Sequence, residues 1–166
     1  AQKAGPLGRM GPKRVAEPGV KFESLPKIDA ILLSHNHYDH MEIVTLKEIV
    51  ARDKALIITP LGNDIILRRQ GIDSQIEVMD WHQSYPISKD VNIILTPAEH
   101  WSSRYGMDKN RALWGGFIVQ SSIGYVYFAG DTGYGDGGIF KAIKEKYGVP
   151  KIAILPIGAY EPRWFM

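Results

Sequence analysis

The chain contains no cysteine. Disulfides are therefore excluded, and so is a zinc site built on thiolates, which leaves histidine and carboxylate as the ligands of any metal. No apolar stretch approaches the roughly 18 residues that cross a membrane. Residues 1–14 carry glycine, proline and basic side chains where a signal peptide has an apolar core. The absent cysteine is compatible with a cytoplasmic protein.

A strong charge of either sign is also missing. The formal net charge of the 166 residues is +2, and no block of about five or more like charges occurs. Neither a basic stripe nor interleaved aromatics point to nucleic acid as a partner. The hydrophobic share of 45% and the charged share of 23% suit one ordinary globular domain.

The patterning along the chain predicts an α/β protein in which strands and covering helices alternate. Residues 1–28 read as an irregular N-terminal arm with repeated prolines and glycines. Helical stripes or caps predict helices over 41–52, 63–71 and 138–148. Apolar or alternating runs predict strands over 29–34, 55–60, 75–81, 91–100 and 151–160, and a hairpin over 115–133. The first and last of these strands have the continuous apolar character of buried strands.

Polar groups follow three of the predicted strands at their C-terminal ends. They are the segment His35 to His40, the pair Glu99-His100, and Asp131. In layered α/β folds such strand ends are where ligands gather. The sequence therefore predicts a functional site at one edge of the sheets.

The segment "HNHYDH" (35–40) has the spacing of a metal site. Residues i and i+2 of an extended segment face the same side, so His35 and His37 can hold one ion. A turn into the next helix would bring Asp39 and His40 to a neighbouring position for a second ion. Imidazole and carboxylate suit zinc and, less selectively, iron or manganese.

Each of these residues also has a simpler interpretation. The segment could be a histidine-rich surface turn, His100 a hydrogen-bonded histidine, and Asp131 a turn former within "GDTG". Taken together, the three segments favour metal ligation. His82 has no such neighbours, and we interpret it as a structural or surface residue.

Four motifs extend this pattern: "SHNHYDH", "TPAEHW", "FAGDTGY" and "LPIGAYEPRWFM". With them, the chain resembles the metallo-β-lactamase fold superfamily. "MGPKR" (10–14), "LWG" (113–115) and the last motif are similar to its N-acylphosphatidylethanolamine-hydrolysing phospholipase D branch. The resemblance implies a four-layer αββα sandwich with two divalent metal ions, expected to be zinc, at one edge.

The resemblance also implies roles for individual residues. His35, His37 and His100 would hold the first ion, Asp39 and His40 the second, and Asp131 would bridge the two. Asp39 would in addition act in catalysis, by orienting the attacking hydroxide or relaying its proton. Tyr160 would face the substrate, although a packed aromatic explains it equally well.

The implied function is that of a metal-dependent phosphodiesterase in which hydroxide, activated by two metals, attacks phosphorus in a phospholipid. The products would be phosphatidic acid and an N-acylethanolamine. A lipid substrate implies peripheral membrane contact, for which the basic arm (Lys3, Arg9, Lys13, Arg14) is a candidate and a solvated tail the alternative. The oligomeric state stays open.

The chain departs from the family pattern at both ends. The family places a further histidine ligand beyond "EPRWFM" and begins with strands that do not precede Ala1 here. We therefore expect an αββα domain over 1–166 that is incomplete at both ends. Two other functions stay open: hydrolysis of a different bond (a lactone, a sugar phosphate or another phosphodiester), and a non-catalytic module with an incomplete site.

Overall fold

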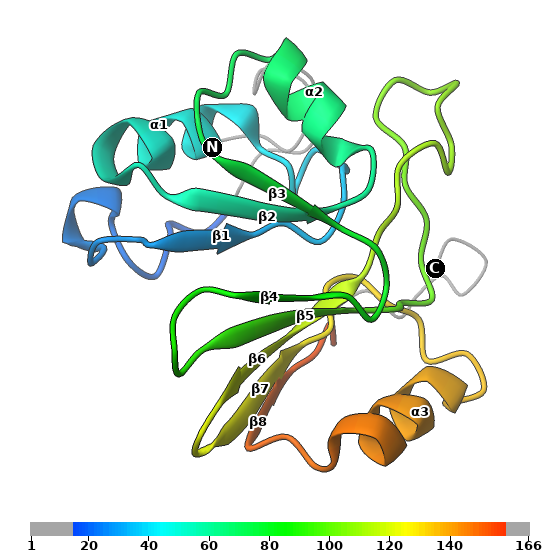
Figure 1. The fold of residues 1–166 in the computed structure, drawn as a ribbon. Coiled ribbons are helices and arrows are strands. Elements are labelled where there is room, and N and C mark those ends of the chain that lie inside the picture. Colours follow the sequence, from blue (N-terminus) through cyan, green and yellow to red (C-terminus); the bar gives the residue numbers. More distant parts are fainter. Residues whose placement is uncertain (1–14, 159–166) are drawn as a thin grey trace.

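The computed structural model describes residues 15–158. Two β-sheets face each other, and helices cover the outer face of each sheet (Figure 1). Helices α1 and α2 lie on one side, helix α3 lies on the other, and the sheets lie between them. This arrangement is the αββα sandwich that the motifs predicted, so the predicted fold class is confirmed.

The first sheet is parallel and has the strand order β1-β2-β3. Its strands are β1 (Ala30–Leu32), β2 (Leu56–Pro60) and β3 (Ile76–Met79). Parallel neighbours need a crossover, which α1 (Ile43–Asp53) and α2 (Asn63–Arg69) provide. Because the three strands are parallel, the C-terminal ends of β1, β2 and β3 lie at the same edge of the sheet.

The second sheet has the order β4-β5-β6-β7-β8 and is antiparallel except for the parallel β7–β8 pair. Its strands are β4 (Ser84–Pro86), β5 (Asn92–Thr96), β6 (Gly116–Ser121), β7 (Gly124–Phe128) and β8 (Ile152–Ile154). Helix α3 (Gly138–Tyr147) makes the crossover between β7 and β8.

Three apolar clusters fill the three interfaces between the layers. Leu46 and Val50 of α1 and Leu67 of α2 pack on the outer face of the first sheet, around Ile57. Between the sheets the central residues are Ile58, Met79, Ile93, Leu95 and Phe117. On the far side, Ile143 of α3 packs on the second sheet together with Ile94, Ile118, Tyr125 and Tyr127. Because β2 contributes Ile57 to one cluster and Ile58 to the next, the alternation of side chains along one strand joins two layers.

Two strands are less buried than their apolar sequences predicted. β1 is half-buried, and Ile152 and Ile154 of β8 are 58% and 53% exposed. Both strands lie at an edge of the described sheets, where a strand has one neighbour instead of two. In the predicted irregular arm, residues 15–28 contain one 3₁₀ turn, Phe22–Ser24. Residues 1–14 lie outside the described residues.

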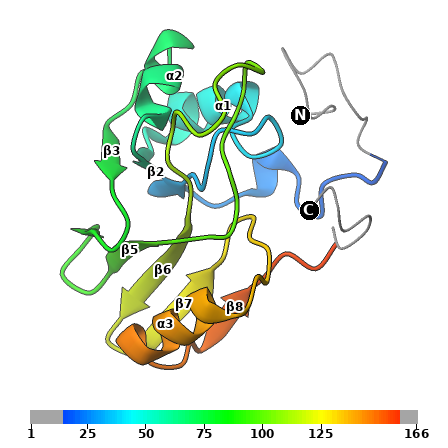
Figure 2. The same ribbon diagram turned by 90° about the vertical axis from the view of Figure 1, so that its right-hand side faces the viewer.

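A long connection between β5 and β6 leaves the second sheet and passes beside the first. Figure 2 shows it rising from β5 to the level of α1 and α2 and then returning to β6. It contains His100 and residues 101–115. Among the helices described within residues 15–158, none combines the length and apolar character needed to cross a bilayer.

Candidate metal centre

The histidine-rich segment begins where β1 ends. The ladder to β2 continues to Leu33, whose N–H donates to the Ile58 carbonyl at 2.9 Å, and His35 follows with 1% of its surface exposed. The chain then turns, because the N–H groups of His40 and Met41 both donate to the His37 carbonyl, at 3.2 and 2.8 Å.

The turn is fixed on its far side by helix α1. The Glu42 carboxylate accepts hydrogen bonds from Val44 N at 3.2 Å and Thr45 N at 2.7 Å, which caps two free N–H groups of the helix. Met41 is fully buried beside Leu46 in the outer apolar cluster. The sequence from strand to turn to helix therefore holds the imidazoles of His37 and His40 near the end of β1.

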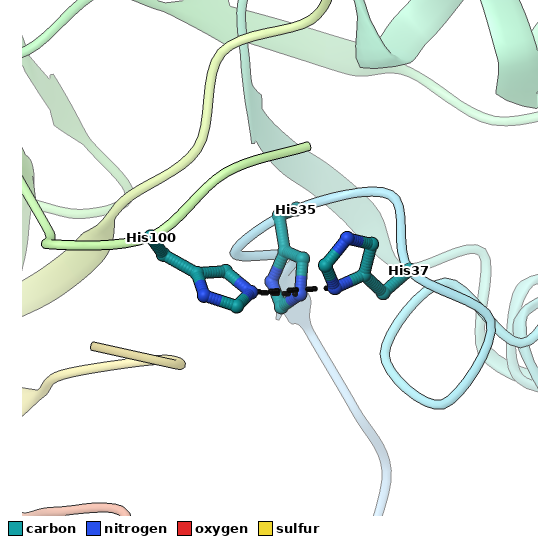
Figure 3. Close-up of side chains that lie close together, drawn as sticks. All are labelled: His35, His37 and His100. Carbon is teal, nitrogen blue, oxygen red and sulfur yellow. Dashed lines mark hydrogen bonds between the residues drawn. The ribbon is translucent and has the colours of Figure 1, made fainter. Parts of the chain in front are cut away.

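His100 and Asp131 reach this turn from the other sheet. His100 lies shortly after β5 and Asp131 shortly after β7. Gly130 makes the approach of β7 possible: its φ is +64°, and an added Cβ would lie 2.8 Å from the Gly115 carbonyl oxygen and 3.0 Å from Ser34 Cβ. Figure 3 shows the His100 ring coming from its own segment to face His35 and His37.

The first group of donor atoms has the spacing of a tetrahedral site. Nε2 of His100 lies 3.2 Å from Nε2 of His35 and 3.3 Å from Nδ1 of His37 (Figure 3). Around a tetrahedral ion with metal–nitrogen bonds of about 2.0–2.1 Å, neighbouring ligand atoms are about 3.3 Å apart. Both distances from His100 therefore match the edges of such a site, and all three nitrogens lie within 4.8 Å of one another.

The second group adds a carboxylate beside the first. Oδ2 of Asp131 lies 3.1 Å from Nε2 of His40, 3.9 Å from Nε2 of His35 and 3.8 Å from Nε2 of His100. Within residues 15–158, His35, His37 and His100 form one close set of ligand atoms, and His35, His40 and Asp131 form a second. The two sets share His35, and Asp131 belongs to the second, so its bridging of two ions stays a prediction.

Asp39 lies at the rim of this cluster. Its Oδ2 is 3.7 Å from Nε2 of His40, and its side chain is 60% exposed. It belongs to neither close set of donors, so its roles as a ligand and in catalysis stay predictions. Tyr160 lies outside the described residues, and its substrate contact stays a prediction as well.

Ser34 is a site residue that the sequence analysis missed. Its buried hydroxyl lies 3.0 Å from Nδ1 of His35 and 3.5 Å from Nδ1 of His40. When Nδ1 carries the proton and donates it to this oxygen, the lone pair of Nε2 is free to bind a metal. Hydrogen bonds of this kind fix the tautomer and the ring orientation of histidine ligands. The signal available in the sequence was the position of Ser34, directly before His35 at a strand end.

Burial keeps two of the imidazoles neutral. It is the main cause that lowers the pKa of His100 to about 4, and with the neighbouring histidines it also lowers the pKa of His35 far below its ordinary value. Neutral imidazole is the form that binds a metal. At neutral pH both side chains therefore offer lone pairs, a condition that favours a cation in the cluster.

His40 and Asp131 behave as an ion pair. The hydrogen bond from His40 is the main cause that lowers the pKa of the Asp131 carboxyl. Burial acts to lower the pKa of His40, but the hydrogen bond with Asp131 and the charges of Asp131 and Asp39 outweigh it, and the pKa rises. A carboxylate that is ionised and aimed at three imidazoles supplies the negative charge that a divalent cation requires.

An aromatic side chain borders the cluster. The Trp101 ring packs edge-on against His37, with centroids 4.4 Å apart, and Lys109 Nζ lies 5.1 Å from the centre of the Trp101 ring. His82, which we interpreted as a structural or surface residue, is exposed and makes its contact with the Tyr147 hydroxyl, 3.3 Å from its Nδ1. It belongs to neither set of donors.

Sequence comparison matches residues 4–166 to the Beta-lactamase superfamily domain. The chain therefore belongs to the metallo-β-lactamase superfamily, in agreement with the fold and with the clustered histidines. Its likeness to an isothiocyanate hydrolase from Delia radicum gut bacteria has a TM-score of 0.61 at 22% identity and covers 81% of this chain and 51% of that one. At this identity the likeness concerns the fold alone.

Within the superfamily the chain is similar to one branch. N-acyl-phosphatidylethanolamine-hydrolyzing phospholipase D 1 of Caenorhabditis elegans is 38% identical over 164 residues, which are 94% of this chain and 46% of the relative. The mitochondrial N-acyl-phosphatidylethanolamine-hydrolyzing phospholipase D of Saccharomyces cerevisiae is 37% identical over 160 residues, 93% of this chain and 34% of the relative. The resemblance predicted from the motifs is confirmed. The chain spans less than half the length of both relatives.

Proposed function

We propose that the complete protein is a metal-dependent phosphodiesterase that hydrolyses N-acylated phosphatidylethanolamine to phosphatidic acid and an N-acylethanolamine. The observation that carries the proposal is the cluster of four imidazoles and the Asp131 carboxylate at the junction of the two sheets. The substrate class rests on the similarity to two phospholipases D over more than nine-tenths of the chain.

In this proposal His35, His37 and His100 hold one divalent ion, while His40, Asp131 and Asp39 contribute to a second. The donor set suits zinc, since it consists of neutral imidazoles and carboxylates at tetrahedral spacing. Such ions, when bound, supply Lewis-acid assistance at a phosphoryl oxygen and a nucleophile derived from water at neutral pH.

The protein side chains have separate tasks around that chemistry. Ser34 orients His35 and His40, and Asp131 keeps its negative charge between the imidazoles. The exposed Asp39 carboxylate is available to accept a proton at the open side of the cluster. Trp101 packs edge-on against His37 and borders the cluster on that side. A lipid substrate also requires peripheral contact with a bilayer.

The test uses the full-length protein, loaded with zinc and given vesicles that contain N-acylphosphatidylethanolamine. We expect release of N-acylethanolamine, its loss on chelation, and its return with zinc. His100→Ala should abolish release, whereas His82→Ala is the matched control, because His82 is an exposed histidine away from the donors. Metal bound without release of this product would reject the substrate, and a panel of lactones, sugar phosphates and other phosphodiesters would then identify the bond. An absence of bound metal would favour a non-catalytic module.

A further inference from the structure

Arg104 lies in the long connection between β5 and β6, in a loop with a fixed backbone. The Asn110 N–H donates to the Ser102 carbonyl at 2.7 Å and closes the base of the loop. Inside it, the Asp108 carboxylate accepts hydrogen bonds from the backbone N–H groups of Arg104 and Tyr105, both at 2.9 Å, and from the Ser103 hydroxyl at 2.8 Å. These bonds determine where the Arg104 side chain begins.

The guanidinium of Arg104 contacts the histidine-rich turn at three points. Its Nη1 donates to the Asn36 carbonyl at 3.0 Å and to the Met41 carbonyl at 2.9 Å. Its Cζ lies 4.2 Å from the centre of the Tyr38 ring, so the guanidinium also makes a cation–π contact. A single side chain therefore contacts both ends of the turn and its middle.

These contacts enclose candidate metal ligands. Asn36 and Met41 flank residues 37–40, which contain His37, Asp39 and His40. Because Asn36 and Met41 are 1% and 0% exposed, few other donors can reach their carbonyls. Inside the turn, the backbone N–H groups of His40 and Met41 both donate to the His37 carbonyl. The carbonyls of Asn36 and Met41 instead accept hydrogen bonds from Arg104.

Arg104 also joins two segments that carry ligands. His100 precedes it by four positions in the same connection, and Nε2 of His100 must stay near Nδ1 of His37, which lies 3.3 Å away. The relative position of these two atoms depends on how the connection lies against the turn. The guanidinium bonds fix that relation outside the ligand shell.

We propose that Arg104 is a positioning residue for the candidate metal centre: by holding the carbonyls of Asn36 and Met41, it sets the distance between His100 and the ligands of the turn. The inference rests on the metal site of the proposed function. Within residues 15–158 its side-chain hydrogen bonds go to the carbonyls of Asn36 and Met41 and not to a ligand atom, so Arg104 acts through the backbone of the turn and through the segment that carries His100. Mutation of a group hydrogen-bonded to a metal ligand typically costs 10–100-fold in metal affinity, and we take this as the scale of the loss expected for Arg104.

The experiment compares Arg104→Met and Arg104→Lys with wild type in the full chain. Methionine keeps an unbranched stem of similar bulk but removes every donor, whereas lysine keeps the charge and a donor without the flat group that stacks on Tyr38. Arg111→Met is the matched control, since Arg111 lies in the same connection and is exposed. Affinities for Zn²⁺ are measured by chelator competition, and Co²⁺ loading reports ligand geometry through its visible absorption.

We expect a 10–100-fold loss of Zn²⁺ affinity and an altered Co²⁺ spectrum for Arg104→Met, a smaller loss for Arg104→Lys, and no change for Arg111→Met. In the metal-free protein, hydrogen exchange of residues 36–41 should accelerate in Arg104→Met and not in the control. A lower melting temperature with unchanged affinity and spectrum would make Arg104 a purely structural residue and overturn the inference alone. A wild-type chain that binds neither ion would overturn the inference and the proposed function together.

Discussion

Oδ2 of Asp131 lies 3.1 Å from Nε2 of His40, although His40 follows a strand of the first sheet and Asp131 a strand of the second. The pair therefore connects the two sheets at one edge. The same carboxylate oxygen lies within 3.9 Å of His35 and 3.8 Å of His100. Its position predicts that removal of this one charge should alter metal binding without removing the first group of donors.

Asp131→Asn keeps the shape of the side chain and removes its charge. We expect the number of Zn²⁺ ions per full-length chain to fall from about two to about one, and hydrolysis to fall on the order of 10²-fold or more, because charge stabilisation is lost where the reaction needs it. Elemental analysis after gel filtration and product release measure the two effects. An asparagine variant that keeps both ions would contradict the bridging position.

Ser34→Ala removes the hydroxyl that lies against Nδ1 of His35 and His40. We expect Zn²⁺ affinity to fall about 10–100-fold while the fold is kept, since the alanine fills nearly the same space. Chelator competition measures the affinity. Ser121→Ala is the control, because the Ser121 hydroxyl bonds the Gly124 carbonyl in the β6–β7 hairpin. Equal affinity in both variants would exclude an orienting role for Ser34.

Gly130→Ala should destabilise the protein by at least about 2 kcal/mol, because a Cβ there meets the Gly115 carbonyl and Ser34 at a positive φ. This corresponds to a melting temperature lower by about 4–8 °C. Gly106→Ala is the matched control, since Gly106 also has a positive φ, +82°, but nothing lies within 4 Å of its added Cβ. Its cost should be about 1–2 kcal/mol. Equal shifts in both variants would mean that the close approach at Gly130 relaxes freely.

Low pH should reduce the free energy of unfolding of the metal-free protein. In the folded protein the pKa of His100 is about 4, against an ordinary value of 6.5, and the pKa of His35 is also lowered. Between pH 6.5 and 4 the unfolded chain therefore binds protons that the folded chain does not, so stability falls as the pH drops through this window. Each such histidine contributes a slope approaching about 1.4 kcal/mol per pH unit.

Urea unfolding with chelator present, at several pH values across that window, measures the slope. His100→Asn should reduce it, because one of the histidines whose pKa is lowered in the folded protein is removed; the pKa of His35 and of His37 is lowered too, mainly by burial. His40 acts in the opposite sense, since its pKa is raised and its contribution is lost as the pH increases through that value. A free energy of unfolding that does not change from neutral pH to pH 4.5 would contradict the neutral state of the buried imidazoles.

Much of the fold could be predicted because periodicity is a local signal. The three predicted helices match α1, α2 and α3 to within two residues at each end. Strand β4 (Ser84–Pro86) was missed, because three residues that include a proline carry too short an alternation to detect. The exposure of β8 was also missed, since a strand's place at the edge of a sheet depends on its neighbours and leaves no mark in its own apolar residues.

The same distinction applies to the site. His35, His37, His40, His100 and Asp131 were predicted to come together because their residue types and their positions after strands are visible in the sequence, and the structure brings them together. Ser34 and Arg104 were not singled out. Serine and arginine have many ordinary uses, and their contacts here depend on the packing of segments that lie far apart in the chain. The roles of Asp39 and Tyr160 stay predictions.

The placement of the donors on both halves of the sandwich has a consequence for the life of the protein in a cell. An ion bound in the proposed site by the ends of both sheets would have to be released before those halves could part, so metal occupancy and resistance to unfolding should rise together. Scarcity of the metal would then lower the stability of the protein, and so shorten its lifetime, as well as abolish its activity.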